Sequence, residues 1–264
     1  MKRLRSELVF LAAQWQANFA SAMEYRAAFV SQIVGMFVND IVYIFFWVVF
    51  FDRFKQIRGW GVGDILLLNA VVATGYGLAF TFFGNALQLS RVIAQGQLDY
   101  YLALPRGVLL NVLASRMSNS ALGDISFGIV TYLLTGRFTP AEIGLWLIGS
   151  LLAAVVFVMA FTFFHSLTFW LGNASGLAEQ AMNAMLTFAM YPSDIFQGVV
   201  RFMMFTLLPA AFVGLVPLQV VRGLDLNGLA LLAGAALTIT FAASTTFYAG
   251  LRRYESGSAI NVNG

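Results

Sequence analysis

The sequence predicts an all-α integral membrane protein. We expect six transmembrane helices, an amphipathic helix before the first of them, and a re-entrant helical hairpin before the last. Of the 264 residues, 60% are hydrophobic and only 10% are charged, whereas a soluble domain carries about 25% charged residues. The apolar residues also fall into runs of about 20, which is the length of a helix that crosses a bilayer. No loop is long enough for a second domain, so residues 1–264 are expected to form one transmembrane domain.

The composition argues against several classes of function. The lysines and arginines are scattered and form no basic stripe, so nucleic acid is not an expected partner. The chain has no cysteine and a single histidine, His165, so no metal site is expected and a structural role is favoured for that histidine. Neither lysine, Lys2 or Lys55, follows a glycine, so there is no P-loop for ATP. We expect no catalytic residues, no cofactor on this chain and, from its basic but interrupted start, no signal peptide.

Residues 1–28 are expected to form an amphipathic helix that lies along the cytoplasmic headgroups. Apolar side chains recur every three or four positions from Leu4 to Met23, opposite polar ones. The basic residues at its start and Trp15 within it suit the interface between lipid and water. The alternative is a helix that packs against protein.

The first four spans are expected at residues 29–51, 65–89, 109–134 and 139–170, and the last at residues 229–251. Asp64 is placed to cap the second span. Polar residues at 115–119 suggest that the start of the third span faces protein or water. The fourth span begins with a capping box, Thr139 to Glu142, with proline in its first turn.

The segment from 172 to 222 allows two interpretations. Its apolar runs are interrupted by Pro192, Pro209 and Pro217, so it forms either one span to about Met190 followed by a broken hairpin, or two spans. With one span, both termini are cytoplasmic and nine of the fifteen basic residues lie inside. A second span would move the Arg252–Arg253 pair outside, so we favour six spans in total.

Three ionisable residues within the expected spans are candidates for a translocation path. Asp40 lies in the middle of the first span and Asp124 within the third, and each costs about 3 kcal/mol at the bilayer centre unless it is paired or hydrated. Arg116 precedes Asp124 by eight residues, which places both on one face of a continuous helix. The alternative is that the acids are hydrogen-bonded and fix helix packing.

The polar break at residues 90–107 is expected to be cytoplasmic. Within it, Leu98, Tyr101, Leu102 and Pro105 recur at intervals of three and four, after Gly96. This spacing predicts a short amphipathic helix with a glycine at its entrance and a proline at its exit. An apolar face on a cytoplasmic loop implies burial against headgroups or in the groove of another protein.

The order of these motifs resembles that of ABC-2 type transporter permeases, and most closely a bacterial subfamily with six spans. The matching elements, in chain order, are Glu24-Tyr25-Arg26, the pattern G-x-L-D-x-x-L-x-x-P over residues 96–105, Tyr191-Pro192, Ile195-Phe196, the stretch 208–213 with Pro217, and residues 251–256, Leu-Arg-Arg-Tyr-Glu-Ser. Each motif alone is weak, but their order and spacing cover nearly the whole chain.

The resemblance implies a permease of the bacterial inner membrane, acting as an exporter. It implies membrane lipids as surroundings, a second permease, identical or homologous, and a cytoplasmic ATP-binding cassette ATPase that carries ATP and Mg²⁺. Residues 91–106 would couple to that ATPase, through Gly96, Leu98, Asp99, Tyr101, Leu102 and Pro105. Residues 191–223 would form short re-entrant helices on the outer side, with Tyr191, Pro192, Pro209 and Pro217. The alternatives are a proton-coupled secondary transporter and a lipid-binding or lipid-modifying membrane protein.

Overall fold

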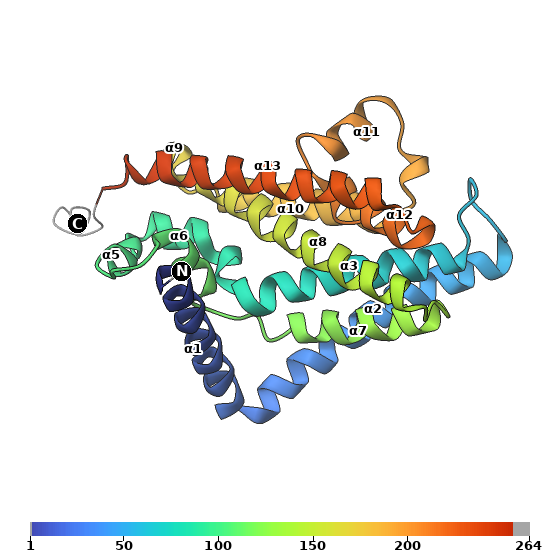
Figure 1. The fold of residues 1–264 in the computed structure, drawn as a ribbon, viewed down its shortest axis with the longest axis horizontal. Helices are drawn as coiled ribbons and strands as arrows, with labels where there is room; N and C mark the ends of the chain where they lie inside the picture. The colour runs from blue at the N-terminus through green and yellow to red at the C-terminus, as the bar shows by residue number, and fades with distance from the viewer. Residues whose placement is uncertain (1, 256–264) are drawn as a thin grey trace.

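The structure, a computed structural model, describes residues 2–255, and every regular element among them is a helix. Long helices run side by side, with α1 set across one end (Figure 1). The long helices are α1 (Lys2–Glu24), α2 (Arg26–Arg53), α3 (Val62–Phe83), α7 (Ala121–Leu134), α8 (Pro140–Ser166), α10 (Ser175–Met190) and α13 (Leu226–Leu251). The short ones are η1 (Gly84–Gln88), α4 (Leu89–Ala94), α5 (Leu98–Leu102), α6 (Val108–Ala114), α9 (Thr168–Leu171), η2 (Ser193–Ile195), α11 (Gly198–Phe205), η3 (Ala210–Phe212) and α12 (Leu215–Gly223).

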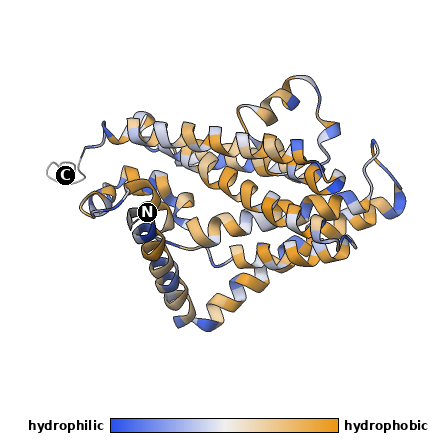
Figure 2. Ribbon diagram, viewed as in Figure 1, coloured by the Kyte–Doolittle hydropathy of each residue, from blue (hydrophilic) through white to orange (hydrophobic). Residues whose placement is uncertain are grey.

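Among the described residues, four helices are long and apolar enough to cross a membrane, and Figure 2 shows that hydrophobic residues dominate them. They are α2, the continuous run of α3 to α4, the run of α8 to α9, and α13. A fifth crossing is obtained if α11 and the segment Ala210–Gly223, which are bent by 62° relative to each other, count as one span. The all-α membrane class is therefore confirmed. Six crossings remain a prediction, because α7 and α10 have 14 and 16 residues, fewer than the about 20 that a span needs.

The core of the bundle is built around α3 and α8. In the most apolar stretch of each long helix, 72% of the residues are buried in α3 to α4 and 61% in α8 to α9, against 11% in α2 and 17% in α13. Helix α7 packs against α2 and α3, while α12 and α13 pack against α8. The outward faces of α2 and α13 carry exposed apolar side chains such as Phe45 and Phe241, so these two helices present the surface that suits lipid.

Two glycines allow α7 to pack closely between its neighbours. A Cβ atom at Gly123 would lie 2.5 Å from the carbonyl oxygen of Ile33 in α2. A Cβ atom at Gly128 would collide with the hydroxyl of Thr74 in α3 and lie 2.8 Å from its backbone nitrogen. Small residues permit this backbone approach between membrane helices. This close packing fixes the rotation of α7 about its own axis, and with it the direction in which Asp124 points.

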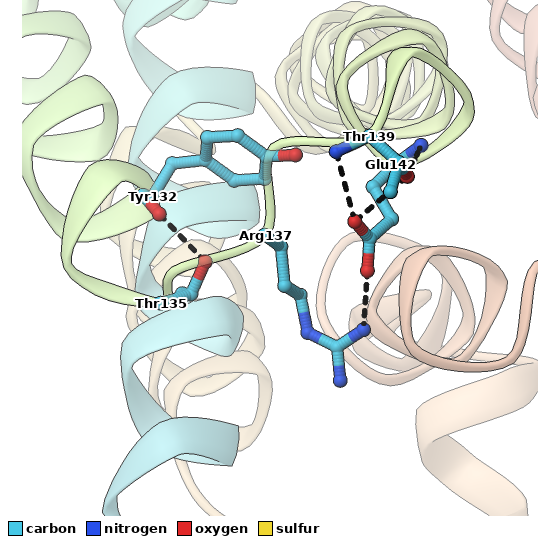
Figure 3. A network of polar contacts seen from close by, with 5 residues as sticks. All are labelled: Tyr132, Thr135, Arg137, Thr139 and Glu142. Carbon is cyan, nitrogen blue, oxygen red and sulfur yellow. Dashed lines mark hydrogen bonds and ion pairs between the residues drawn. The ribbon is translucent and has the colours of Figure 1, made fainter.

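The predicted capping box at the start of α8 is confirmed (Figure 3). The Glu142 backbone N–H donates to Thr139 Oγ1 at 3.3 Å, and the Thr139 backbone N–H donates to Glu142 Oε2 at 3.1 Å. Arg137 donates to the other carboxylate oxygen at 2.9 Å. Beside this network, the ring of Tyr132 stacks on Trp146 with centroids 4.1 Å apart, which joins the end of α7 to α8. The cap at Asp64 is also present, since its carboxylate accepts from the Gly61 backbone N–H at 3.0 Å.

The expected third span is not one continuous helix. Helix α6 ends at Ala114 and α7 begins at Ala121, so residues 115–120 separate them. Their backbone bonds to α3 instead of continuing the helix: the Ser118 N–H donates to the Phe80 carbonyl at 2.9 Å. The segment also packs on Gly84, where a Cβ atom would lie 2.5 Å from the Ser118 nitrogen. The expectation that Arg116 and Asp124 share one helix face is therefore wrong.

Helix α1 is amphipathic as predicted, and one side of it packs on the rest of the chain. Leu11 is buried, the Trp15 indole N–H donates to the Phe82 carbonyl at 2.8 Å, and the Asn18 amide donates to the Ala114 carbonyl at 3.0 Å. Leu8 and Phe19 remain exposed. The helix thus combines packing on protein with an apolar strip left uncovered, which suits a position at the lipid interface.

Candidate functional site

Three parts of the chain meet at one end of the bundle: the start of α1, the segment 90–107, and the end of α13 (Figure 1). Arg106 bridges the first two, since its guanidinium donates to Ser6 Oγ at 2.9 Å and lies 3.4 Å from Glu7 Oε1. The same guanidinium sits over the ring of Phe10, 5.0 Å from its centroid. The beginning and the end of the described chain therefore lie on the same side as the segment 90–107.

Gly96 gives the segment 90–107 a defined turn. Its φ of +72° lies in the left-handed region, which favours glycine. The Gln97 N–H donates to the Val92 carbonyl at 3.0 Å and the Gly96 N–H to the Ile93 carbonyl at 3.2 Å. These two bonds form a Schellman motif, which ends α4 and satisfies its last carbonyls. The glycine entrance and the short helix after it, α5, are present as predicted.

Leu98 does not belong to an exposed docking face. Its side chain is completely buried in the core of this chain, so the expectation that Leu98 and Leu102 dock together on a partner is wrong for Leu98. Leu98 is the first residue of α5 and is covered by the bundle, whereas Leu102, the last residue of the same helix, is 45% exposed. Tyr100, which the sequence analysis did not single out, is 68% exposed beside it. Leu102 and Tyr100 therefore form the exposed apolar tip of α5.

The remaining residues of the segment hold α5 in place. The Tyr101 hydroxyl donates to Ser115 Oγ at 2.9 Å, which ties α5 to the break before α7. Asp99 interacts with Tyr254, which follows the end of α13. The pKa of Tyr254 is raised to about 12, mainly because its hydroxyl is buried and to a smaller extent because Asp99 is close to it. Pro105 is exposed at the end of the segment, just before Arg106.

Asp40 and Asp124 face one cavity inside the bundle. The cavity has a volume of about 280 Å³ and is lined by residues of α2, α3, α7 and α10. Both aspartates are more than nine-tenths buried, and they are close enough for their charges to interact. In each, the Oδ2 atom has no hydrogen-bond partner within the described part of the chain.

Asn69 adds a third acceptor to this cavity. Its side chain is buried; its amide nitrogen donates to the Ile65 carbonyl at 2.9 Å, and its Oδ1 has no partner among the described residues. Asn69 was not among the predicted site residues, although a polar residue inside the apolar run 65–89 is a usable signal. Tyr43, Tyr76 and Phe127 supply aromatic walls. The site thus presents oxygen acceptors within largely apolar surroundings.

Arg116 lies in a different place from the two aspartates. It is exposed on the break before α7 and lines a separate cavity of about 390 Å³ between α1, the start of α2 and residues 116–119. The three ionisable residues therefore do not form one polar lining. His165 has the structural role expected of it, since its Nδ1 lies 2.6 Å from Ser90 Oγ in a buried hydrogen bond between α8 and α4.

The region 191–223 lies at the opposite end of the bundle from α5 (Figure 1). Helix α10 ends just before Tyr191 and Pro192, α11 ends before Pro209, and Pro217 stands in the first turn of α12, so helices start or stop at all three prolines. Tyr191 packs edge-on against Trp47, with centroids 5.6 Å apart. These contacts attach the region to α2.

Asp194, which the sequence analysis missed, connects this region to the loop after α2. Its carboxylate accepts from the Trp60 indole N–H at 2.7 Å, and its backbone carbonyl accepts from the Arg58 guanidinium at 2.6 Å. Arg201 lies 3.4 Å from the same carboxylate. The sequence does not show that Asp194 joins these two regions, because Arg58 and Trp60 are more than 130 residues away from it.

Comparison with known proteins identifies one related family. A family model described as "ABC-2 family transporter protein" matches residues 37–258, which is well over half of the chain. The matched range includes Asp40, the segment 90–107, Asp124 and the region 191–223. Neither a curated protein nor a solved structure matched the sequence.

Proposed function

Since the chain belongs to the ABC-2 family of transporter proteins, we propose that it is an exporter permease driven by a separate cytoplasmic ATP-binding cassette ATPase through residues 91–106. The family places the chain among membrane transporter components. ATP and Mg²⁺ would bind to the ATPase, and a second permease, identical or homologous, would complete the transporter. The direction of transport rests on the resemblance alone.

The shape of the segment 90–107 is the observation that carries this proposal. A coupling element has to expose a surface to its partner and be attached firmly enough to transmit a displacement. The tip of α5, Tyr100 and Leu102, is exposed, while Leu98 is buried beneath it and Tyr101 is hydrogen-bonded to Ser115. Tyrosine is one of the residue types that most often anchor protein interfaces, and Leu102 extends the apolar surface beside it.

The proposed topology has α5 and both chain ends in the cytoplasm and the region 191–223 on the outer side of a bacterial inner membrane. The ends of the described chain lie beside α5, which supports an even number of crossings. Six crossings follow if α2, α3, α7, α8, α10 and α13 each cross once, with α7 extended by α6. The basic residues Arg91, Arg106, Arg252 and Arg253 then lie inside, as the positive-inside tendency requires.

Introduced cysteines test the topology directly, because the chain contains none of its own. We expect a membrane-impermeant maleimide to label Val199→Cys on intact cells, and Tyr100→Cys only after the cells are opened. Both side chains are exposed, at 73% and 68%. Labelling of Tyr100→Cys on intact cells would contradict the assigned sides.

Coupling is tested by purification in mild detergent with ATP hydrolysis as the readout. We expect the wild-type chain to bring along a P-loop ATPase, and Leu102→Asp to lose both that chain and the hydrolysis at an unchanged folded yield. Val199→Asp is the matched control, since it places the same charge on an exposed apolar residue of α11, at the other end of the bundle. Full ATPase retention by Leu102→Asp combined with Tyr100→Asp would refute coupling through this segment.

A further inference from the structure

The cavity between α2, α3, α7 and α10 has an unusual balance of hydrogen-bonding groups. Three buried oxygen atoms face it without a partner among the described residues: Oδ2 of Asp40, Oδ2 of Asp124 and Oδ1 of Asn69. Among the described residues that line it, none is a lysine, arginine or histidine. A buried acceptor without a donor is costly, and two neighbouring carboxylates without a cation more so. The arrangement thus has three acceptors without partners and no cationic side chain to balance the two carboxyl groups.

An organic ammonium group supplies what the cavity lacks. It carries one positive charge and up to three N–H donors, and the cavity offers three acceptors. The walls are chiefly apolar, with the rings of Tyr43, Tyr76 and Phe127 among them, and aromatic faces attract cations. Within the described residues no group of three or more His, Cys, Asp or Glu is arranged to hold a metal ion, and it is the apolar and aromatic lining that favours an organic cation.

We propose that this cavity binds the ammonium head of an amphipathic organic cation, and that such a cation is the class of substrate that the permease carries. The inference rests on the proposed transport function.

The position of Asn39 indicates how such a molecule reaches the cavity. Asn39 lines the cavity from α2 but is itself exposed, near the middle of the helix, where its exposed neighbours include the apolar Val38 and Val42. The cavity therefore opens sideways there, at the depth of the lipid tails. A ligand with a hydrocarbon chain can leave that chain outside while its ammonium head enters. The Tyr43 hydroxyl closes the side toward α10 by donating to the Met190 carbonyl at 2.9 Å.

Binding of octylammonium to the purified chain in lipid nanodiscs, measured by calorimetry against empty nanodiscs, tests the proposal. We expect saturable binding of octylammonium and none of octanoate or octanol. Asp40→Asn and Asp124→Asn should each weaken the binding at least tenfold. Asp52→Asn is the matched control, because it makes the same change at an exposed position of α2, outside the cavity.

A further variant keeps the test decisive if an asparagine variant fails to fold. Ala73→Phe leaves both carboxyl groups in place and fills the cavity that Ala73 lines, so it should abolish the binding. Equal binding of octylammonium and octanol would overturn the proposal, as would unchanged affinity in Ala73→Phe or in a folded Asp124→Asn variant. The measurement needs no ATPase, so its failure leaves the coupling proposal standing, and loss of ATPase association leaves this one standing.

Discussion

Leu98 and Leu102 are a natural pair for separating stability from coupling. They are the same residue type at two positions of one short helix, but Leu98 is completely buried whereas Leu102 is 45% exposed. Truncation of a fully buried leucine to alanine costs about 2–5 kcal/mol, because apolar contacts are lost and a cavity remains. At Leu102 roughly half of the burial is absent from the start, so the loss is about 1 kcal/mol or less in the isolated chain.

These magnitudes convert into thermal shifts that are easy to measure. For a chain of this size, 1 kcal/mol corresponds to about 2–4 °C in Tm, so Leu98→Ala should lower the Tm by about 4–20 °C and Leu102→Ala by less than about 4 °C. The assay is the loss of monodisperse protein on heating in detergent, followed by chromatography. ATPase association at low temperature should show the reverse order, with Leu102→Ala the more impaired. Equal thermal losses, or coupling lost only in Leu98→Ala, would refute the assignment of Leu98 to the core and of Leu102 to the partner surface.

Three further predictions concern the packing and the polar contacts. Gly128→Ala should destabilise the chain by about 1–3 kcal/mol, because the added Cβ meets Thr74. Gly144→Ala is the control in α8, where a Cβ has open space, and it should be neutral or stabilising. Similar Tm values for the two variants would contradict the close packing of α7. Thr139→Ala should cost about 1 kcal/mol through loss of the helix cap, measured by the same heating assay with Thr238→Ala as a control inside α13. The pKa of Tyr254 is raised to about 12, so the stability that its neutral form contributes is complete below about pH 10 and lost as the pH rises to 12. Tyr254→Phe should therefore lose less stability at alkaline pH than the wild-type chain. An identical dependence of Tm on pH in the two proteins would argue against the burial of Tyr254.

The local features of the fold were predictable because each depends on neighbours in the sequence. Thr139 and Glu142 form the capping box within one turn. Helices start or stop at Pro192, Pro209 and Pro217, because proline lacks the N–H that a helix interior needs. Gly96 adopts the left-handed turn that ends α4. The order of these features also sufficed to indicate the family. None of them requires knowledge of what lies across the bundle.

The errors concern residues whose surroundings come from distant parts of the chain. The break at residues 115–120 is stabilised by α3, since Ser118 bonds to Phe80 and packs on Gly84. From hydropathy alone, the polar residues there were compatible with a helix that faces water. Leu98 and Leu102 are four positions apart and belong to the same helical pattern, so the sequence does not distinguish them. Only the packed bundle shows that Leu98 is the one that is covered.

Asp40 and Asp124 show where prediction from single residues ends and packing begins. Each aspartate was recognisable alone, because a charge at membrane depth is costly. Their meeting in one cavity depends on α7 lying close to both α2 and α3, which in turn depends on Gly123 and Gly128. Neither glycine carries a chemical signature of a binding site. A site of this kind is specified by small residues that let helices approach, and the acids acquire a common ligand only as a consequence of that approach.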